Sequence, residues 1–541
     1  MSSPASPPQS PQSPQSGWRR VVAGWRPLLT RRMGGPLGGH SLKPVGAWSY
    51  VLTSQSPSGA GTVIWRRPRP TAAWAYLLAT VSWLVCMAHQ LPCRQATPTS
   101  SVDTFGWMCY SDLTALYFTR GQDTGAVPYS SATWEYPVLT GYFATIANWL
   151  SKLFGAVLSP SANGQQLLDN GHIYFAISAI GLFACLIWTI SSLLKLAPQM
   201  PVLAMGVAIS PTLMANGLIN WDLLVVALAV AGLAAWSRQR YAMAGIWWGL
   251  GVAAKLYPIV IIAALLIYCL RRDSKPRAWV SWLRMALCAL VAWFIVNIPV
   301  MVFHFDGWEV FYVNNANRGA DLGSLWYALN LSGVTSSHWD AWSRYVMVAG
   351  YLALAVLIFF ARKAPSPTQI AYLAVVIMVV ANVVYSPQYV LWILPLVMLV
   401  RPVALDITIF TISELFYYAC IWLYLRQTMT LQDYSTPTLY IASIFIRVAA
   451  TLWVVVRVVR DVLRQRCAGP VLADDDVHPR YRPLHRLGRP TPDRPAARPQ
   501  TVPAAPAGPR VPGNPDSQRA ARPDQPLPGT TTEAGQPRTT P

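Results

Sequence analysis

The chain has 541 residues, of which 53% are hydrophobic and only 12% are charged, and its mean hydropathy is positive. Soluble proteins carry about a quarter charged residues, so this composition excludes an ordinary soluble enzyme and predicts an all-α polytopic membrane protein. The net charge of +20 does not indicate nucleic-acid binding, because the cations follow apolar segments, as the positive-inside rule requires of cytoplasmic ends.

Residues 1–70 contain nine Lys or Arg and no Asp or Glu, and they are rich in Pro, Ser and Gly. This composition predicts a disordered cytoplasmic N-terminal segment. From Cys467 onward the chain holds ten Arg and seven acidic residues without an apolar period. We therefore expect a disordered Pro/Arg-rich cytoplasmic tail over 461–541, and a transmembrane domain over 71–460.

Apolar segments with basic flanks predict about twelve spans in a multi-pass cell-membrane protein, with both termini in the cytoplasm. The expected spans are 72–91, 172–194, 199–215, 219–236, 242–254, 257–270, 279–302, 344–361, 367–385, 388–400, 403–425 and 437–460.

A long first outer loop is expected over residues 92–171. Within it, Val138–Leu158 is apolar but contains Asn148 and Lys152. A span here would put every later basic cluster on the wrong side of the membrane, so we expect an amphipathic helix on the outer surface.

The same loop contains Cys93 and Cys109, sixteen residues apart. A disulfide persists in an oxidising outer compartment, which makes these two cysteines a disulfide candidate. Spacing alone does not establish the geometry of a bridge, so the bonded and the free forms both stay open.

Two carboxylates stand in this loop. Asp112 is either a general base facing a membrane-embedded donor or the N-cap of a short surface helix. Glu135, in Trp-Glu-Tyr-Pro, either orients a substrate hydroxyl or favours the N-terminus of the helix that follows. The residues alone leave both alternatives open.

Ionisable residues also stand at the ends of later spans. Asn220 and Asp222 lie at the outer start of one span, where a carboxylate is costly and tends to be functional or paired. Lys255 and Tyr257 lie where 242–254 and 257–270 meet, and irregular backbone at that depth is tolerated only if it is buried in protein or lines a cavity. Lys255 either pairs with Asp222 or holds a phosphate.

A second outer loop, about 303–343, carries Arg318, whose fork of donors matches phosphate oxygens, although a solvated loop cation is the alternative. Gln388 and Tyr389 follow Ser-Pro between two apolar segments and either line the cavity or form an ordinary turn. The His residues are few and unclustered, and P-loop and HExxH motifs are missing, so no metal site is predicted.

Five short motifs occur in order: Cys-Tyr-Ser-Asp, Trp-Glu-Tyr-Pro-Val-Leu-Thr-Gly, Asn-Gly-Leu-Ile-Asn-Trp-Asp, Ala-Gly-Ile-Trp-Trp-Gly-Leu-Gly-Val-Ala-Ala-Lys-Leu-Tyr-Pro and Tyr-Ser-Pro-Gln-Tyr. With these motifs, residues 70–460 resemble the family 87 glycosyltransferases. These are integral membrane enzymes of the GT-C type, typified by actinobacterial polyprenol-phosphate-mannose-dependent α-1,2-mannosyltransferases.

The resemblance implies a GT-C architecture and a catalytic carboxylate in the first outer loop, which is Asp112 here. The expected substrate-binding residues are Glu135, Asn220, Asp222, Lys255, Tyr257, Arg318, Gln388 and Tyr389. The implied function is the inverting transfer of a hexose, mannose by preference, from a polyprenyl-phosphate donor to a cell-envelope glycolipid or glycan at the outer face.

One carboxylate base and a phosphate-binding cation suffice for this reaction, because the lipid phosphate leaves as a stabilised anion. No cofactor is expected beyond the lipid-linked donor, which is a co-substrate, and no nucleic-acid partner is expected. The alternative function is a secondary transporter or lipid flippase. A transporter places its ionisable residues near the midplane of its spans, whereas most of those here lie at the outer ends.

Overall fold

The computed structural model describes residues 72–98, 100–159, 164–271, 277–427 and 437–464. It also describes two short strands, β1 (Leu42–Pro44) and β2 (Tyr50–Leu52), which pair in an antiparallel hairpin. All of these belong to one unit, Met1–Arg482, and the second unit, Pro483–Pro541, lies outside the described residues. The disorder predicted for 1–70 and for 461–541 falls almost entirely outside the described residues and stays a prediction.

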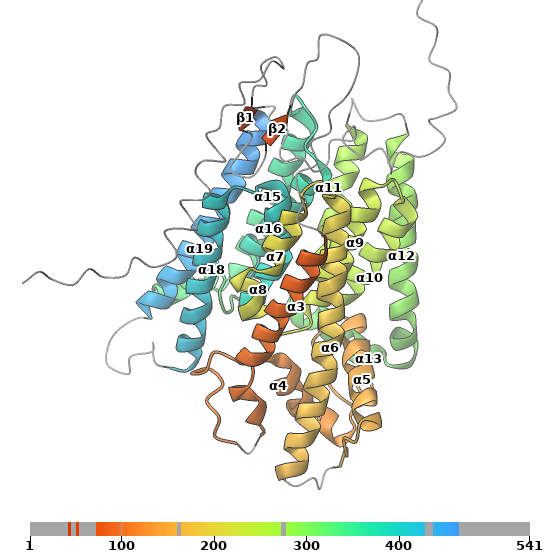
Figure 1. Cartoon of the computed structure of the whole chain (residues 1–541), viewed down its shortest axis with the longest axis vertical. Coiled ribbons are helices and arrows are strands. Elements are labelled where there is room, and N and C mark those ends of the chain that lie inside the picture. Colours follow the sequence, from red (N-terminus) through yellow and green to blue (C-terminus); the bar gives the residue numbers. More distant parts are fainter. Residues whose placement is uncertain are drawn as a thin grey trace, which may run out of the picture. The chain divides into compact units, whose positions relative to one another are not determined.

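Helices make up nearly all of the described secondary structure (Figure 1). They are α3 (Ala72–His89), α4 (Asp112–Thr119), α5 (Val138–Leu153), α6 (Gly164–Leu196), α7 (Pro201–Ala208), α8 (Pro211–Asn216), α9 (Asp222–Ser237), α10 (Tyr241–Ala254), α11 (Pro258–Leu270), α12 (Ala278–Phe303), α13 (Phe305–Ala316), α14 (Leu325–Leu331), α15 (Trp339–Phe360), α16 (Pro367–Ala381), α17 (Val390–Val400), α18 (Ala404–Leu425) and α19 (Thr438–Leu463), with the 3₁₀ turns η1 (Pro92–Gln95), η2 (Gln122–Thr124) and η3 (Pro387–Tyr389).

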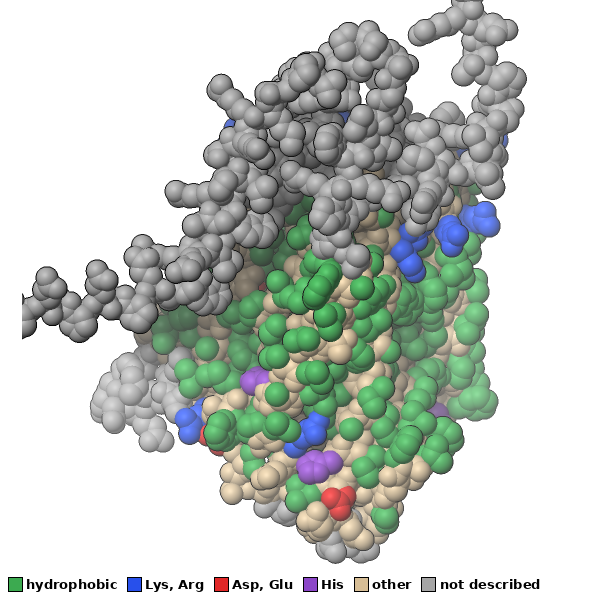
Figure 2. Space-filling view, in the orientation of Figure 1, with side chains coloured by type: hydrophobic (Ala, Val, Ile, Leu, Met, Phe, Trp, Pro, Cys, Tyr) green, Lys and Arg blue, Asp and Glu red, His purple; other side chains and the backbone are tan. Residues whose placement is uncertain are grey.

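Six of these helices are long and apolar enough to cross a membrane: α3, α6, α12, α15, α18 and α19. Five shorter apolar segments of 10–17 residues accompany them in the described part of the chain. Figure 2 shows a face largely covered by hydrophobic side chains, and Leu77 and Leu84 of α3 are among those exposed. The predicted all-α polytopic membrane fold is confirmed, whereas the number of twelve spans stays a prediction.

Several predicted boundaries differ from the observed ones. The segment expected to span from 172 begins at Gly164, because its first turns carry polar residues that hydropathy does not recognise as helix. The segment expected over 199–215 is broken into α7 and α8 at Pro211, which starts the second helix because it has no N–H to donate within the first. The helix expected over 344–361 begins at Trp339.

The helix predicted in the first outer loop is α5, and it ends at Leu153 rather than at 158. Residue 155 is a glycine with a φ of +99°, a conformation that terminates helices and suits glycine. Ala144 and Asn148 are buried on one face of α5, whereas Ile146 and Trp149 are exposed. Figure 1 shows α4, α5 and α13 at the same end of the long helices α3, α6 and α12.

Helix α9 is the centre of the bundle. Nearly all of its side chains are buried, and it packs against α6 and α10 and, through fewer contacts, against α17. A helix that is apolar on every side is stable only when protein or lipid surrounds it. The first residue of this enclosed helix is Asp222, so the fold places one carboxylate at the buried end of its central element.

Candidate active site

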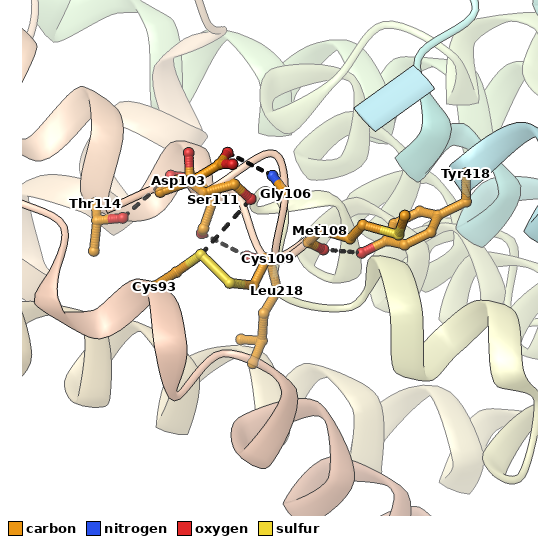
Figure 3. The surroundings of a disulfide bond; sticks show 10 residues. Cys93, Asp103, Gly106, Met108, Cys109, Ser111, Thr114, Leu218 and Tyr418 are labelled. Atoms are coloured by element: carbon orange, nitrogen blue, oxygen red, sulfur yellow. Dashed lines mark hydrogen bonds between the residues drawn. A yellow bond between two sulfur atoms is a disulfide. The ribbon is translucent and has the colours of Figure 1, made fainter. Parts of the chain in front are cut away.

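The loop that precedes Asp112 is fixed to the bundle at two points (Figure 3). Cys93, in η1, forms a disulfide with Cys109. Next to this bridge, the hydroxyl of Tyr418 in α18 donates a hydrogen bond to the carbonyl oxygen of Met108. The candidate disulfide of the sequence is thus present, and it lies three residues before Asp112.

Asp112 is the first residue of α4, and the N-cap of that helix is Ser111. The Ser111 hydroxyl accepts a hydrogen bond from the N–H of Leu113 at 3.3 Å and donates one to the carbonyl of Leu218 at 2.6 Å. The N–H of Asp112 donates to the carbonyl of Ile219 at 2.7 Å. Because Ser111 caps the helix, the Asp112 carboxylate is free to bind other partners. The two bonds to the carbonyls of Leu218 and Ile219 hold the 218–220 segment next to it.

The Asp112 carboxylate accepts hydrogen bonds from two side chains that come from distant parts of the chain. The Asn220 amide nitrogen lies 2.8 Å and the Tyr136 hydroxyl 3.0 Å from Asp112 Oδ2. The same amide also donates to the Tyr136 oxygen at 2.7 Å, so Asp112, Tyr136 and Asn220 form a closed network of three hydrogen bonds. Predicted residues Asp112 and Asn220 are thus brought together, with Tyr136 between them.

Burial raises the pKa of the Asp112 carboxyl above its ordinary value. Hydrogen bonds from Tyr110 and Tyr136, together with the nearby Lys255 cation, oppose this rise because they stabilise the charged form. A carboxylate with a raised pKa is a stronger base than a solvated one and is suited to accepting a proton near neutral pH.

Lys255 and Asp222 form the second half of the site. The Lys255 ammonium lies 3.5 Å from Asp222 Oδ1, and the indole N–H of Trp392 donates to the same oxygen at 2.8 Å. The ammonium also lies 4.6 Å from the centre of the Tyr136 ring, so this aromatic side chain contacts both halves of the site. Of the two alternatives for Lys255, pairing with Asp222 is therefore the one that the structure contains.

The break between α10 and α11 is what presents Lys255 at this point. The helix ends at Ala254, whose carbonyl accepts a hydrogen bond from the Thr140 hydroxyl of α5 at 2.8 Å, and Pro258 begins the next helix. This bond fixes the start of α5, immediately after Tyr136, against the end of α10. The Asp222 side chain is completely buried, whereas that of Lys255 retains 12% exposure, so Lys255 is the less enclosed member of the pair.

Three aromatic rings stack behind Asp222. The Trp392 ring lies between those of Tyr257 and Tyr389, with centroid distances of 4.5 Å and 3.9 Å. Gln388 precedes Tyr389 in η3 and is buried. The predicted residues Tyr257 and Tyr389 therefore lie together next to Asp222, where they support it through Trp392.

Two predicted binding residues take part in ion pairs outside this network. Glu135 pairs with Arg120 at the end of α4, and both side chains are about one-third exposed. Arg318 pairs with Asp321 at 2.6 Å and is about half exposed. Exposed pairs of this kind are weak, so neither contact fixes its side chain firmly. The binding roles of Glu135 and Arg318 stay predictions.

Sequence reasoning did not single out Tyr136, Tyr110 or Trp392. Tyr136 stands inside the motif Trp-Glu-Tyr-Pro, where the charged residue is its neighbour Glu135. A neutral aromatic residue carries no charge to mark it as functional, and the chain contains 24 Trp and 24 Tyr from which it would have to be distinguished. Tyr110 and Tyr136 stand in the short motifs, which is the signal that could have pointed to them, whereas Trp392 lies outside all five motifs.

Within the described ranges, no group of three or more His, Cys, Asp or Glu side chains is arranged to hold a metal ion. A family model described as glycosyltransferase family 87 matches residues 136–387. The matched region contains Tyr136, Asn220, Asp222 and Lys255, and it begins after Asp112.

Proposed function

We propose that this chain, in which a glycosyltransferase family 87 model matches residues 136–387, is a membrane glycosyltransferase that moves a hexose from a polyprenyl-phosphate donor to a cell-envelope glycolipid or glycan. Mannose is the sugar we favour, and the reaction takes place at the outer face of the membrane. The single observation that carries the proposal is the Asp112 network, in which a half-buried carboxylate is bound by Tyr136, whose ring also contacts the Lys255 ammonium.

In the proposed reaction Asp112 is the general base. It accepts the proton of an acceptor hydroxyl while the hydroxyl oxygen forms a bond to the anomeric carbon of the donor. The bond from the anomeric carbon to the phosphate oxygen breaks, and its electron pair leaves with the polyprenyl phosphate. Direct displacement of this kind inverts the anomeric centre.

Lys255 holds the donor phosphate in this mechanism. A leaving phosphate needs compensation of its negative charge rather than protonation, and a cation placed beforehand supplies it. The Lys255 side chain retains 12% exposure and its ammonium is held by the buried Asp222, and in the proposed complex the ammonium contacts the phosphate while it keeps this partner. Arg318, which pairs with Asp321 in the second outer loop, is a second cation, and we assign it to the same phosphate.

The test compares membranes that carry the intact chain with membranes that carry Asp112→Asn. Both receive radiolabelled polyprenyl-phosphate mannose and a lipid extract of the host cell. We expect the label to enter a glycolipid or polymer with the intact chain, and transfer to fall by about 10²- to 10⁴-fold in the variant, which is the usual contribution of a general base.

Asp103→Asn is the matched control. Asp103 lies in the same loop, in an exposed pair with Arg426, and the change removes the same charge without touching the Asp112 network. Equal transfer by the Asp112→Asn variant and the intact chain would refute the assignment of Asp112. Parallel reactions with other lipid-linked hexoses and pentoses identify the sugar.

A further inference from the structure

A buried ion pair joins the last two described helices. The Nε atom of Arg447 in α19 lies 2.8 Å from Oε2 of Glu414 in α18, and both side chains are almost completely inaccessible. Charges inside membrane-spanning helices are costly and usually serve a function or one another. Both helices follow the region that matches the family model.

The remaining N–H groups of Arg447 bind backbone rather than acid. Nη1 donates to the carbonyl of Tyr385 at 2.7 Å, and Nη2 donates to the carbonyl of Ser386 at 3.2 Å. The guanidinium also lies over the ring of Tyr385, 3.4 Å from its centre, and the hydroxyl of that tyrosine donates to Glu414 at 3.1 Å. The ion pair therefore holds one short segment, residues 385–386, through four contacts.

That segment is the start of the turn that carries the aromatic stack. Residues Pro387–Tyr389 form η3, Tyr389 stacks on Trp392, and the indole of Trp392 donates to Asp222. Displacing the carbonyls at 385 and 386 would move the first residues of this turn, because a proline and a 3₁₀ turn leave little freedom between them.

The same segment also holds the second outer loop. The N–H of Asp321 donates to the carbonyl of Val383 at 2.8 Å, and the N–H of Tyr385 donates to the carbonyl of Leu322 at 3.2 Å. Asp321 in turn pairs with Arg318. The backbone around Tyr385 is thus bonded on one side to Arg447 and on the other side to the loop that presents Arg318.

We propose that Arg447, held by Glu414, is a positioning residue that fixes the Tyr385–Ser386 turn, and through it Tyr389, Trp392 and Arg318, for binding of the phosphate-bearing donor. The substrate part of this inference rests on the function proposed above. Arginine is required, since the compact ammonium of a lysine cannot match its planar fork, which here binds a carboxylate and two carbonyl groups together.

The chain provides a matched control in Arg401, a partly buried arginine that also joins helices through carboxylates. Arg401 follows α17 and pairs with Asp406 at 2.6 Å and with Asp461 at 2.5 Å, with 16% exposure of its side chain. It joins the same helices α18 and α19, but its described side-chain bonds go to carboxylates and none goes to the turn. Losing Arg401 therefore weakens the bundle without releasing the turn.

The experiment uses the full chain in lipid nanodiscs. It compares Arg447→Gln, Arg447→Lys, the double variant Arg447→Met with Glu414→Met, and Arg401→Gln. The double variant is included because replacing both partners of a buried ion pair with apolar residues commonly preserves stability, whereas removing one partner does not. Hydrogen exchange is measured over residues 383–392 and 318–324, and thermal unfolding is measured alongside.

We expect faster exchange in both segments for every Arg447 variant, including a double variant as stable as the intact chain, and unchanged exchange there for Arg401→Gln. We also expect KM for polyprenyl-phosphate mannose to rise by about 10- to 100-fold in the Arg447 variants with a smaller change in kcat, as for misplacement of a binding group from a distance. Arg401→Gln should retain the KM of the intact chain.

A folded double variant with unchanged exchange and unchanged KM would overturn the proposal. An equal loss of folded protein in all Arg447 and Arg401 variants would also overturn it. Arg447 would then stabilise the whole helix bundle instead of positioning the turn. If the intact chain transfers no mannose, the proposed function fails, but the exchange measurements still decide whether Arg447 holds the turn.

Discussion

Replacing Tyr136 with phenylalanine tests the Asp112 network most directly. The change keeps the ring, which contacts Lys255, and removes only the hydroxyl that donates to Asp112 at 3.0 Å and accepts from Asn220 at 2.7 Å. The hydroxyl stabilises the charged form of Asp112, so its loss raises the pKa of that carboxyl.

The size of the effect follows from the strength of this bond. A hydrogen bond to a charged group contributes about 1.5–3 kcal/mol, and the Tyr136 hydroxyl donates such a bond to the charged form of Asp112. The pKa of Asp112, which burial already raises, should therefore rise further in the variant. Asn220 still donates to the carboxylate in the variant, so the carboxylate stays in place.

The assay is the pH dependence of kcat/KM for sugar transfer. A general base must be unprotonated, so the rate falls as the pH drops through the pKa of Asp112. In Tyr136→Phe this fall in rate should move to higher pH, while the rate at high pH approaches that of the intact chain.

Tyr142→Phe is the control, since its hydroxyl makes one bond, to the carbonyl of Val296, away from Asp112. If the fall in rate at low pH stays in place in Tyr136→Phe, the assignment of Asp112 as the base is refuted. A rate that falls equally at every pH would refute it as well.

Two further perturbations address the rest of the site. Lys255→Met leaves the buried Asp222 without its cation and should lower the free energy of unfolding by about 3–5 kcal/mol. The double variant with Asp222→Asn should regain stability in a thermal unfolding assay but keep a raised donor KM, and a donor KM equal to that of the intact chain would contradict the phosphate role. Cys93→Ser opens a loop in which the bonded cysteines are 16 residues apart, and it should lower the free energy of unfolding by about 3 kcal/mol. Dithiothreitol should lower the melting temperature of the intact chain but not that of Cys93→Ser with Cys109→Ser; an equal effect on both would contradict the bridge.

The fold class was predictable because lipid imposes a strong and simple constraint. Long apolar runs with basic flanks are visible in any sequence, and the six longest apolar helices all lie where spans were expected. The boundaries were less predictable, since polar turns that extend a helix beyond the apolar run, as at Gly164 in α6, do not register in hydropathy.

The charged members of the site were predictable because ionised groups are rare in this chain and costly in a membrane. Asp112, Asp222 and Lys255 all stood out for that reason, and the structure brings them to one place. Their mutual arrangement was not predictable. It depends on backbone bonds between α4 and the 218–220 segment, which are more than 100 residues apart in the sequence.

The two carboxylates of the site occupy different environments, and this difference bears on the stereochemistry of transfer. Retention of the configuration at the anomeric carbon would need a second carboxylate as nucleophile. The two carboxyl groups would then lie about 5 Å apart, on opposite sides of the bond that breaks. Asp222 is completely buried and bound to Lys255 and Trp392, so it cannot reach a substrate carbon without breaking both contacts. Asp112 is half-buried and is bound chiefly by neutral donors. One accessible base favours inversion, so a β-linked donor should give an α-linked product, as measured by NMR or by linkage-specific glycosidases. A β-linked product from that donor would require a covalent intermediate and would contradict the single-base mechanism.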